Sequence, residues 1–223
     1  MKKAVIIVAG GSGNRMKSDI PKQFLLLKGK PILMHTIERF FQFDKDIQIT
    51  LVLPANALSL WKDLCQTYNF AIHHSVTHGG ATRFESVRNG LNLINDVDIV
   101  AVHDGVRPFV SLGVLESCFS MAISKKAVIP VISPNDSIRI ISQDGNHSID
   151  RSTIAIVQTP QVFDFKTIKS AYKQGYNELF TDDASVVESY GQAITFCKGN
   201  VENIKITTPM DLLIAELIVD TAS

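Results

Sequence analysis

Hydrophobic and polar positions form two kinds of segment that alternate along most of the chain. Short runs of mainly β-branched and aliphatic residues occupy positions 4–9, 47–53, 99–102, 127–132 and 194–196. Runs of this length are typical of buried strands. The segments 55–68 and 112–124 instead have apolar residues at helical spacing. Strand and helix signals in alternation predict an α/β protein with a doubly wound, mostly parallel sheet, a Rossmann-like arrangement.

Proline marks the start of two further predicted helices. Pro31 precedes the apolar series Ile32, Leu33, Ile37, Phe40 and Phe41, and Pro209 follows Thr208 near the end of the chain. Proline is favoured in the first helical turn, where its missing N–H would have no partner anyway. We therefore expect a helix after Pro31 and a last helix that continues almost to the C-terminus.

One region departs from this alternation. Between positions 135 and 153, two alternating segments flank the sequence Gln143-Asp144-Gly145-Asn146. An Asp-Gly pair in this setting is a strong β-hairpin signal. A hairpin inserted into a parallel α/β fold projects from it and needs a partner to bury its apolar side. We predict one domain over residues 1–223 with an inserted β-arm at 135–157 that forms a homodimer; the alternative is a surface flap.

Composition limits the partners and the compartment. The 223 residues include 22 Lys+Arg and 22 Asp+Glu, so the net charge is zero. Nucleic acid is therefore not expected as a partner, because a polyanion is bound by a basic surface. The three cysteines, Cys65, Cys118 and Cys197, lack CxxC spacing, which favours a reducing compartment over a disulfide framework. The N-terminal apolar run is too short for a signal peptide or a membrane span. We expect a cytoplasmic protein without a membrane partner.

The first strand leads into a glycine-rich loop. Residues 5–9 run into Gly10-Gly11-Ser12-Gly13, and Arg15 and Lys22 follow. Glycines let a ligand approach the backbone, and successive N–H groups there bind anions. The dinucleotide fingerprint does not fit because Met16 replaces its third glycine, and no register supplies the Gly-Lys-Ser/Thr of a P-loop. A plain strand-to-helix turn would explain the glycines but not the cations, so we predict a nucleoside triphosphate site.

A second group of charged residues follows the strand at 99–102. Asp104 comes after His103 and before Gly105, which places its carboxylate at the same sheet edge as the glycine loop. One carboxylate, with triphosphate oxygens and waters, commonly holds Mg²⁺. The alternatives are a turn-forming Asp104 and an Arg107 that caps the next helix. Lys205 lies in the strand-like run 203–207, where it should meet either solvent or a phosphate.

Two predicted helix starts also lie near glycine or acidic residues. Thr82 and Glu85 form a capping box after Gly79-Gly80, so Glu85 is interpreted as structural, and Gly79, Gly80 and Ser86 could contact a base. The sequence 181–185 caps another helix. His73, His74 and His78 lack a matching ligand group and are interpreted as solvated loop residues.

These features occur together, and in the same order, in one known family. Its landmarks here are Ala9-Gly10-Gly11-Ser12-Gly13-x-Arg15-Met16, Pro21-Lys22-Gln23, Gly79-Gly80-x-x-Arg83-x-x-Ser86-Val87, His103-Asp104-x-x-Arg107-Pro108, Asp136-Ser137, Asp150-Arg151, Gln158-Thr159-Pro160-Gln161, Thr181-Asp182-Asp183-Ala184-Ser185 and Asn203-Ile204-Lys205-Ile206-Thr207. Over nearly its whole length the chain resembles the cytidylyltransferases of the isoprenoid pathway, specifically the 2-C-methyl-D-erythritol 4-phosphate cytidylyltransferase family.

The resemblance implies CMP transfer from CTP to a polyol phosphate, with Mg²⁺, and a role for each matching residue. The implied catalytic residues are Arg15, Lys22 and Lys205. The implied nucleotide contacts are Ala9, Gly10, Gly11, Ser12, Gly13, Gly80, Ala81, Ser86 and, at the ribose, Gly105. The implied acceptor-site residues are Asp104, Arg107, Ser137, Arg151, Thr159, Thr181 and Lys205, with Asp104 as the metal ligand and Ser137 and Arg151 reaching the partner subunit's acceptor.

Departures from the family pattern keep alternatives open. Ser137 stands where the family often has threonine, and Gly105-Val106 stands where it often has Ala-Ala. The sequence His103 to Pro108 also resembles ribitol-5-phosphate cytidylyltransferases, which make CDP-ribitol. A GTP preference is a further alternative. A non-catalytic nucleotide-binding regulatory module would be expected to lose Lys22 or Asp104, and both are present.

Overall fold

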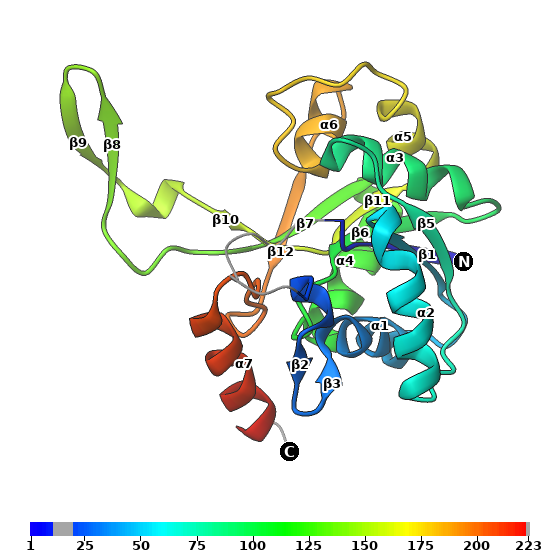
Figure 1. The fold of residues 1–223 in the computed structure, drawn as a ribbon. Coiled ribbons are helices and arrows are strands. Elements are labelled where there is room, and N and C mark those ends of the chain that lie inside the picture. The colour runs from blue at the N-terminus through cyan, green and yellow to red at the C-terminus, as the bar shows by residue number, and fades with distance from the viewer. Residues whose placement is uncertain (11–19, 222–223) are drawn as a thin grey trace.

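A central eight-stranded sheet organises the computed structural model, which describes residues 1–10 and 20–221 (Figure 1). The strand order is β10-β7-β11-β6-β1-β4-β5, with β12 paired to β7. The strands are β1 (Lys3–Val8), β4 (Gln48–Leu53), β5 (Ser75–His78), β6 (Ile99–Asp104), β7 (Ala127–Ile132), β10 (Ile156–Val157), β11 (Gln161–Asp164) and β12 (Thr195–Lys198). Of the strands in the described residues, only β10 and β11 run opposite to the direction that the other six share, so the predicted doubly wound, mostly parallel sheet is confirmed.

Helices cover both faces of this sheet, which explains why its strands are continuous apolar runs. The helices are α1 (Ile32–Phe43), α2 (Leu58–Thr67), α3 (Arg83–Leu93), α4 (Leu112–Lys125), α5 (Phe165–Ala171), α6 (Asp183–Ser189) and α7 (Pro209–Thr221). Along β1, Val5 and Ile7 pack into the core beneath α1, α2 and α4, whereas Ala4 and Ile6 pack into the core beneath α3, α5 and α6. None of the helices in the described ranges is long and apolar enough to cross a membrane.

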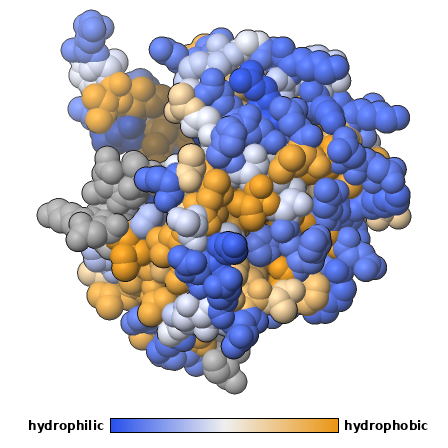
Figure 2. Space-filling view, turned by 45° about the vertical axis from the view of Figure 1, so that its right-hand side comes forward, coloured by the Kyte–Doolittle hydropathy of each residue, from blue (hydrophilic) through white to orange (hydrophobic). Residues whose placement is uncertain are grey.

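The predicted hairpin is confirmed and projects from the sheet (Figure 1). It consists of β8 (Ile138–Ser142) and β9 (Gly145–Ile149), paired with each other and with no other strand of the described chain. Apolar side chains lie exposed on it: Ile141 is 85% exposed and Ile140 is 43% exposed. Figure 2 shows apolar surface on this arm at the upper left. A second short hairpin, β2 (Leu26–Leu27) with β3 (Lys30–Pro31), precedes α1.

Three local sequence interpretations are wrong. The run 203–207 forms no strand; it is an irregular segment in which the Ile206 N–H donates to the Val106 carbonyl. Arg107 does not cap α4, because the Ser111 hydroxyl accepts from the Val114 N–H there. His74 is half-buried rather than solvated.

The contacts of His74 explain its burial. Its Nε2 accepts from the indole N–H of Trp61 (3.0 Å), and its Nδ1 donates to the Ile72 carbonyl (2.7 Å). Its ring also packs against Phe70. Burial lowers the pKa of His74 below its ordinary value, so the neutral ring that this geometry requires is favoured.

Candidate active site

A pocket of about 450 Å³ lies where β1 and β6 end. The register that pairs Val8 with Asp104 places these two strand ends side by side. The pocket therefore lies at the sheet edge that the sequence predicted, which is where ligands of open α/β sheets bind. The pocket is lined by Val8, Ala9, Gly10, Lys22, Gln23, Gly80, Ala81, Thr82, Arg83, Ser86, Asp104, Val106 and Lys205.

The sequence-predicted site residues therefore fall into four groups. Those that line the pocket are Ala9, Gly10, Lys22, Gly80, Ala81, Ser86, Asp104 and Lys205. Three more lie beside Asp104: Gly105 follows it in sequence, Arg107 contacts its carboxylate, and Thr159 contacts its backbone N–H. Ser137 and Arg151 lie exposed at the base of the arm, and Thr181 lies exposed just before α6. Gly11, Ser12, Gly13 and Arg15 lie outside the described residues.

Asp104 is the centre of charge in this pocket. Its Oδ2 atom accepts from Lys205 Nζ at 3.0 Å and from Arg107 Nε at 3.2 Å. Lys205 thus meets a carboxylate in this structure, a partner that the sequence did not suggest. Burial alone would raise the pKa of Asp104, but Lys205, Arg83 and Arg107 hold it well below its usual range. The carboxylate is therefore ionised at neutral pH.

Arg107 extends the network behind Asp104. Its Nη1 atom donates to the Asn203 carbonyl at 2.7 Å, and the Asn203 side chain donates to the Thr159 carbonyl at 2.8 Å. Asn203 is fully buried. These bonds fix the segment that carries Lys205 against the end of β6, so the lysine reaches the pocket from a segment far along the chain.

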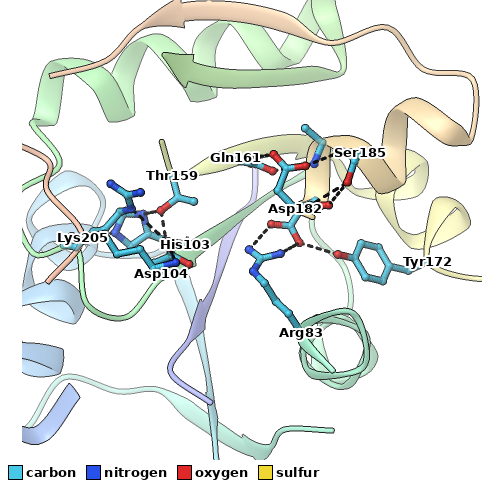
Figure 3. Close-up of polar contacts among 12 residues, drawn as sticks. Arg83, His103, Asp104, Thr159, Gln161, Tyr172, Asp182, Ser185 and Lys205 are labelled. Atoms are coloured by element: carbon cyan, nitrogen blue, oxygen red, sulfur yellow. Dashed lines mark hydrogen bonds and ion pairs between the residues drawn. The ribbon is translucent and has the colours of Figure 1, made fainter. Parts of the chain in front are cut away.

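His103 and Thr159 form a chain of hydrogen bonds whose directions are determined (Figure 3). His103 Nε2 lies 3.0 Å from the Arg107 carbonyl, which can only accept, so Nε2 carries the proton. His103 Nδ1 is then an acceptor for the Thr159 hydroxyl at 3.1 Å. The same hydroxyl accepts from the Asp104 N–H at 3.1 Å. The neutral ring thus fixes the backbone of Asp104 and of Arg107.

Protonation of His103 should make folding stability depend on pH. Burial lowers the pKa of His103 from 6.5 to about 4. Between pH 4 and pH 6.5 the unfolded chain therefore binds more protons at His103 than the folded chain does. The contribution of the neutral ring to folding stability is complete above pH 6.5 and is lost as pH falls toward 4. We expect this residue to lower the free energy of unfolding by about 3 kcal/mol across that window.

Urea unfolding of the wild type and of His103→Gln at about pH 7 and about pH 4.5 measures this effect. Glutamine is polar and cannot titrate, so the variant should lose less stability than the wild type over this interval. Equal losses in the two proteins would contradict the assignment.

The start of α3 forms a rigid turn at the pocket wall. The Thr82 hydroxyl accepts from the Glu85 N–H (3.1 Å), and Glu85 Oε2 accepts from the N–H groups of Ala81 (2.7 Å) and Thr82 (3.2 Å). The predicted capping box and the structural role of Glu85 are confirmed. The Ser86 hydroxyl accepts from the Gly80 N–H (3.1 Å). A Cβ atom at Gly80 would lie 2.3 Å from the Glu85 Cβ, so only glycine fits this turn.

Gly105 has a packing role in this structure. Its N–H donates to the Val8 carbonyl at 2.9 Å, and its carbonyl accepts from the Thr36 hydroxyl at 3.1 Å. A Cβ atom here would lie 2.9 Å from that of Ala9. The glycine therefore lets the ends of β1 and β6 approach each other, and its contact with a ribose stays a prediction.

Sequence reasoning assigned no chemistry to two pocket residues, Gln23 and Arg83. Gln23 is 1% exposed and donates to the Ala9 carbonyl at 2.8 Å, which ties the segment after the glycine loop to β1. Arg83 forms a double hydrogen bond with Asp183 at the start of α6. Both residues belong to landmarks of the family resemblance, but their partners are distant in sequence, and spacing alone carries no signal for them.

Comparison with known proteins agrees with this geometry. A sequence profile described as 2-C-methyl-D-erythritol 4-phosphate cytidylyltransferase matches residues 3–221. The chain belongs to this family. It is similar to the enzyme of that name from Phocaeicola vulgatus, at 52% identity over 98% of this chain and 100% of the relative. The corresponding enzyme from Azobacteroides pseudotrichonymphae is 53% identical over 98% and 99% of the two chains.

Solved structures agree with the assignment to the cytidylyltransferase family. The crystal structure of 4-diphosphocytidyl-2C-methyl-D-erythritol synthase from Anaerococcus prevotii has a TM-score of 0.83 at 27% identity and covers 98% of this chain and 96% of its own. The cytidylyltransferase structure from Thermus thermophilus has a TM-score of 0.80 at 28% identity, with 99% and 100% covered. The chain is therefore a nucleotidyltransferase that uses CTP, and these relatives favour methylerythritol phosphate over ribitol phosphate as its acceptor.

Proposed function

We propose that this cytidylyltransferase transfers CMP from CTP to 2-C-methyl-D-erythritol 4-phosphate. The products are 4-diphosphocytidyl-2-C-methyl-D-erythritol and pyrophosphate. A phosphate oxygen of the acceptor forms a bond to the α-phosphorus of CTP, and the bond from that phosphorus to the bridging α–β oxygen breaks. The observation that carries the proposal is the meeting of Gly10, Lys22, Asp104 and Lys205 in one pocket of a chain that belongs to this family.

The charge of the pocket suits two anionic substrates. Among the described residues that line it, three cations, Lys22, Arg83 and Lys205, outnumber one carboxylate, Asp104, which leaves an excess of two positive charges. An excess of one sign in a cleft raises the local concentration of the opposite ion. The whole chain has no net charge, so this attraction for phosphate is local to the site.

The acceptor phosphate is already a nucleophile at neutral pH, so the reaction requires no catalytic serine, cysteine or general base. Catalysis then depends on position and on electrostatic stabilisation of in-line attack. Lys22, together with Arg15, would stabilise the charge that develops at the transferred phosphorus and on the leaving pyrophosphate. Lys205, Arg107, Thr159 and Thr181 would hold the acceptor phosphate.

We propose Asp104 as the protein ligand of Mg²⁺. A single ionised carboxylate at the wall of a triphosphate pocket fits this ion, which is usually held by one or two carboxylates with phosphate oxygens and waters. When bound, Mg²⁺ would neutralise charge on the triphosphate. Asp104 would hold the ion next to Lys205, because the Asp104 Oδ2 atom contacts the Lys205 ammonium.

The arm would complete the site as a homodimer. Ser137 and Arg151 lie exposed beside the arm, and the apolar side chains of β8 require cover. Arg151 is held by a hydrogen bond from its Nη1 atom to the Asn135 carbonyl. We propose that these two residues reach the acceptor in the partner subunit and that the enzyme works in the cytoplasm, where its cysteines would stay reduced.

Mixing two inactive variants tests this arrangement. In a mixed dimer, the Arg151→Gln protomer supplies an intact Lys22 pocket and the Lys22→Ala protomer supplies an intact arm. An equal mixture should therefore recover up to about a quarter of wild-type activity, since half of the dimers are mixed and each has one intact site. Mixed dimers that stay inactive would show that the arm acts on its own subunit or not at all.

Pyrophosphate release tests the proposed function as a whole. With CTP and Mg²⁺, methylerythritol 4-phosphate should support turnover, while ribitol 5-phosphate should not, and GTP should not replace CTP. Turnover with ribitol 5-phosphate and not with methylerythritol 4-phosphate would leave the proposed reaction type in place and show that the proposed acceptor is wrong.

A further inference from the structure

The ion pair between Arg83 and Asp183 joins two parts of the site that are 100 residues apart in sequence. Arg83 is the first residue of α3, and its Nη1 and Nη2 atoms donate to Asp183 Oδ1 (2.9 Å) and Oδ2 (2.6 Å). Asp183 is the first residue of α6 and is fully buried, whereas the Arg83 side chain is 31% exposed and lines the pocket. Figure 3 shows Arg83 reaching from α3 toward the carboxylate that Tyr172 also contacts.

Further contacts fix the Asp183 end of this ion pair. The Tyr172 hydroxyl donates to Asp183 Oδ1 at 2.6 Å, and the Tyr172 ring stacks on Phe84 with 4.6 Å between centroids. On the other side, the Gln161 amide donates to Asp182 Oδ2 (2.7 Å) and accepts from the Ala184 N–H (2.8 Å). The start of α6 is thus held between β11 and α3.

The pairing with Asp183 limits the charge that Arg83 offers to a ligand. Asp183 neutralises the guanidinium, so the pair adds no net charge for a phosphate. A double Arg–carboxylate hydrogen bond does fix the distance and the angle between the two elements that carry it. Arg83 follows the segment 79–82, and Asp183 follows Thr181.

We propose that Arg83 is a positioning residue that sets the distance between the nucleotide-binding segment 79–86 and the acceptor-binding segment 181–183. This role rests on the proposed function, in which the two segments hold the two reactants. In-line transfer is sensitive to small displacements, because a shift of about 1 Å can cost about a hundredfold in rate. The ion pair would act through Thr181 and through the turn at Gly80, without touching the reacting atoms.

Arg83→Lys tests this role because lysine keeps the charge and loses the paired geometry. We expect the KM for methylerythritol 4-phosphate to rise by about tenfold and kcat to fall by about tenfold. The Kd of CTP, measured by calorimetry without acceptor, should change by less than about threefold, since the capping box holds the α3 turn independently. Asp183→Asn should change the same parameters in the same direction.

Arg88→Lys is the matched control. Arg88 lies on the same helix, is about half exposed, and reaches Glu85 at only 4.0 Å. It should keep the wild-type KM and kcat. If Arg83→Lys behaves like Arg88→Lys, or only lowers Tm, the positioning role is wrong. A rise in the CTP Kd that equals the rise in acceptor KM would instead make Arg83 a nucleotide ligand and would also overturn the proposal.

Amide exchange at residues 181–185 gives a readout that does not depend on turnover. Arg83→Lys should increase exchange there by about tenfold relative to Arg88→Lys. Unchanged exchange would contradict the positioning role. Failure of the wild type to release pyrophosphate would contradict the proposed function, and the exchange measurement would still decide whether Arg83 holds α6.

Discussion

Replacing Lys22 by alanine should lower kcat by about a hundredfold or more while the Kd of CTP rises by less than about fivefold. Lys22 lines the pocket, and the next residue, Gln23, is anchored to the Ala9 carbonyl, so truncation of the side chain leaves the local backbone in place. The lysine charge matters most where negative charge accumulates, at the transferred phosphorus and the leaving pyrophosphate, and this occurs in the transition state. An interaction that strengthens there raises kcat rather than affinity.

Single-turnover kinetics and calorimetry with CTP separate the two quantities. Lys28→Ala is the control, because Lys28 lies on the surface and pairs with Asp220 at 2.8 Å, with both side chains well exposed. It should match the wild type. An unchanged kcat in Lys22→Ala would show that the lysine does not stabilise the transition state and would contradict the proposed mechanism.

Asp104→Asn should lower kcat by about a thousandfold and weaken activation by Mg²⁺. Asparagine keeps the shape of the side chain and removes the charge that faces Lys205 and Arg107. The variant pocket is more positive by one charge, so metal-free CTP should bind at least as tightly as in the wild type. Turnover and anion affinity are thus expected to change in opposite directions.

A titration of turnover against Mg²⁺, with CTP binding measured in parallel, checks this expectation. Asp98→Asn serves as the control, since Asp98 is exposed and precedes the other end of β6, where it accepts from the Lys2 backbone N–H. Its kinetics should be normal. If Asp104→Asn kept the wild-type dependence on Mg²⁺, Asp104 could not be the metal ligand.

The elements that sequence predicted well are those buried on both faces. The strands β1, β4, β6 and β7 read as continuous apolar runs because helices cover both sides of the sheet. β11 was not predicted because only Val162 and Phe163 are apolar in its four residues, and its position between β6 and β7 depends on pairing rather than on pattern. The run 203–207 has a strand-like pattern, but its backbone bonds to the loop after β6 instead of joining the sheet.

The site shows the same division. The position of Asp104 at the end of β6 and the capping box at Thr82 were predictable because each is a local motif with a physical cause. The Arg83–Asp183 pair and the chain from Asp104 through Thr159 to His103 were not, since each joins residues at least 55 positions apart. Sequence spacing carries information only within an element, and tertiary structure decides which buried polar groups become partners.

Isotope labelling of the acceptor tests the central claim most directly. Methylerythritol 4-phosphate carrying ¹⁸O in its phosphate would be incubated with CTP, Mg²⁺ and the enzyme, and the products followed by ³¹P NMR. Attack of the acceptor on the α-phosphorus predicts ¹⁸O in the bridge of the diphosphate product and none in pyrophosphate. Label in pyrophosphate, or no product from this acceptor, would contradict the account.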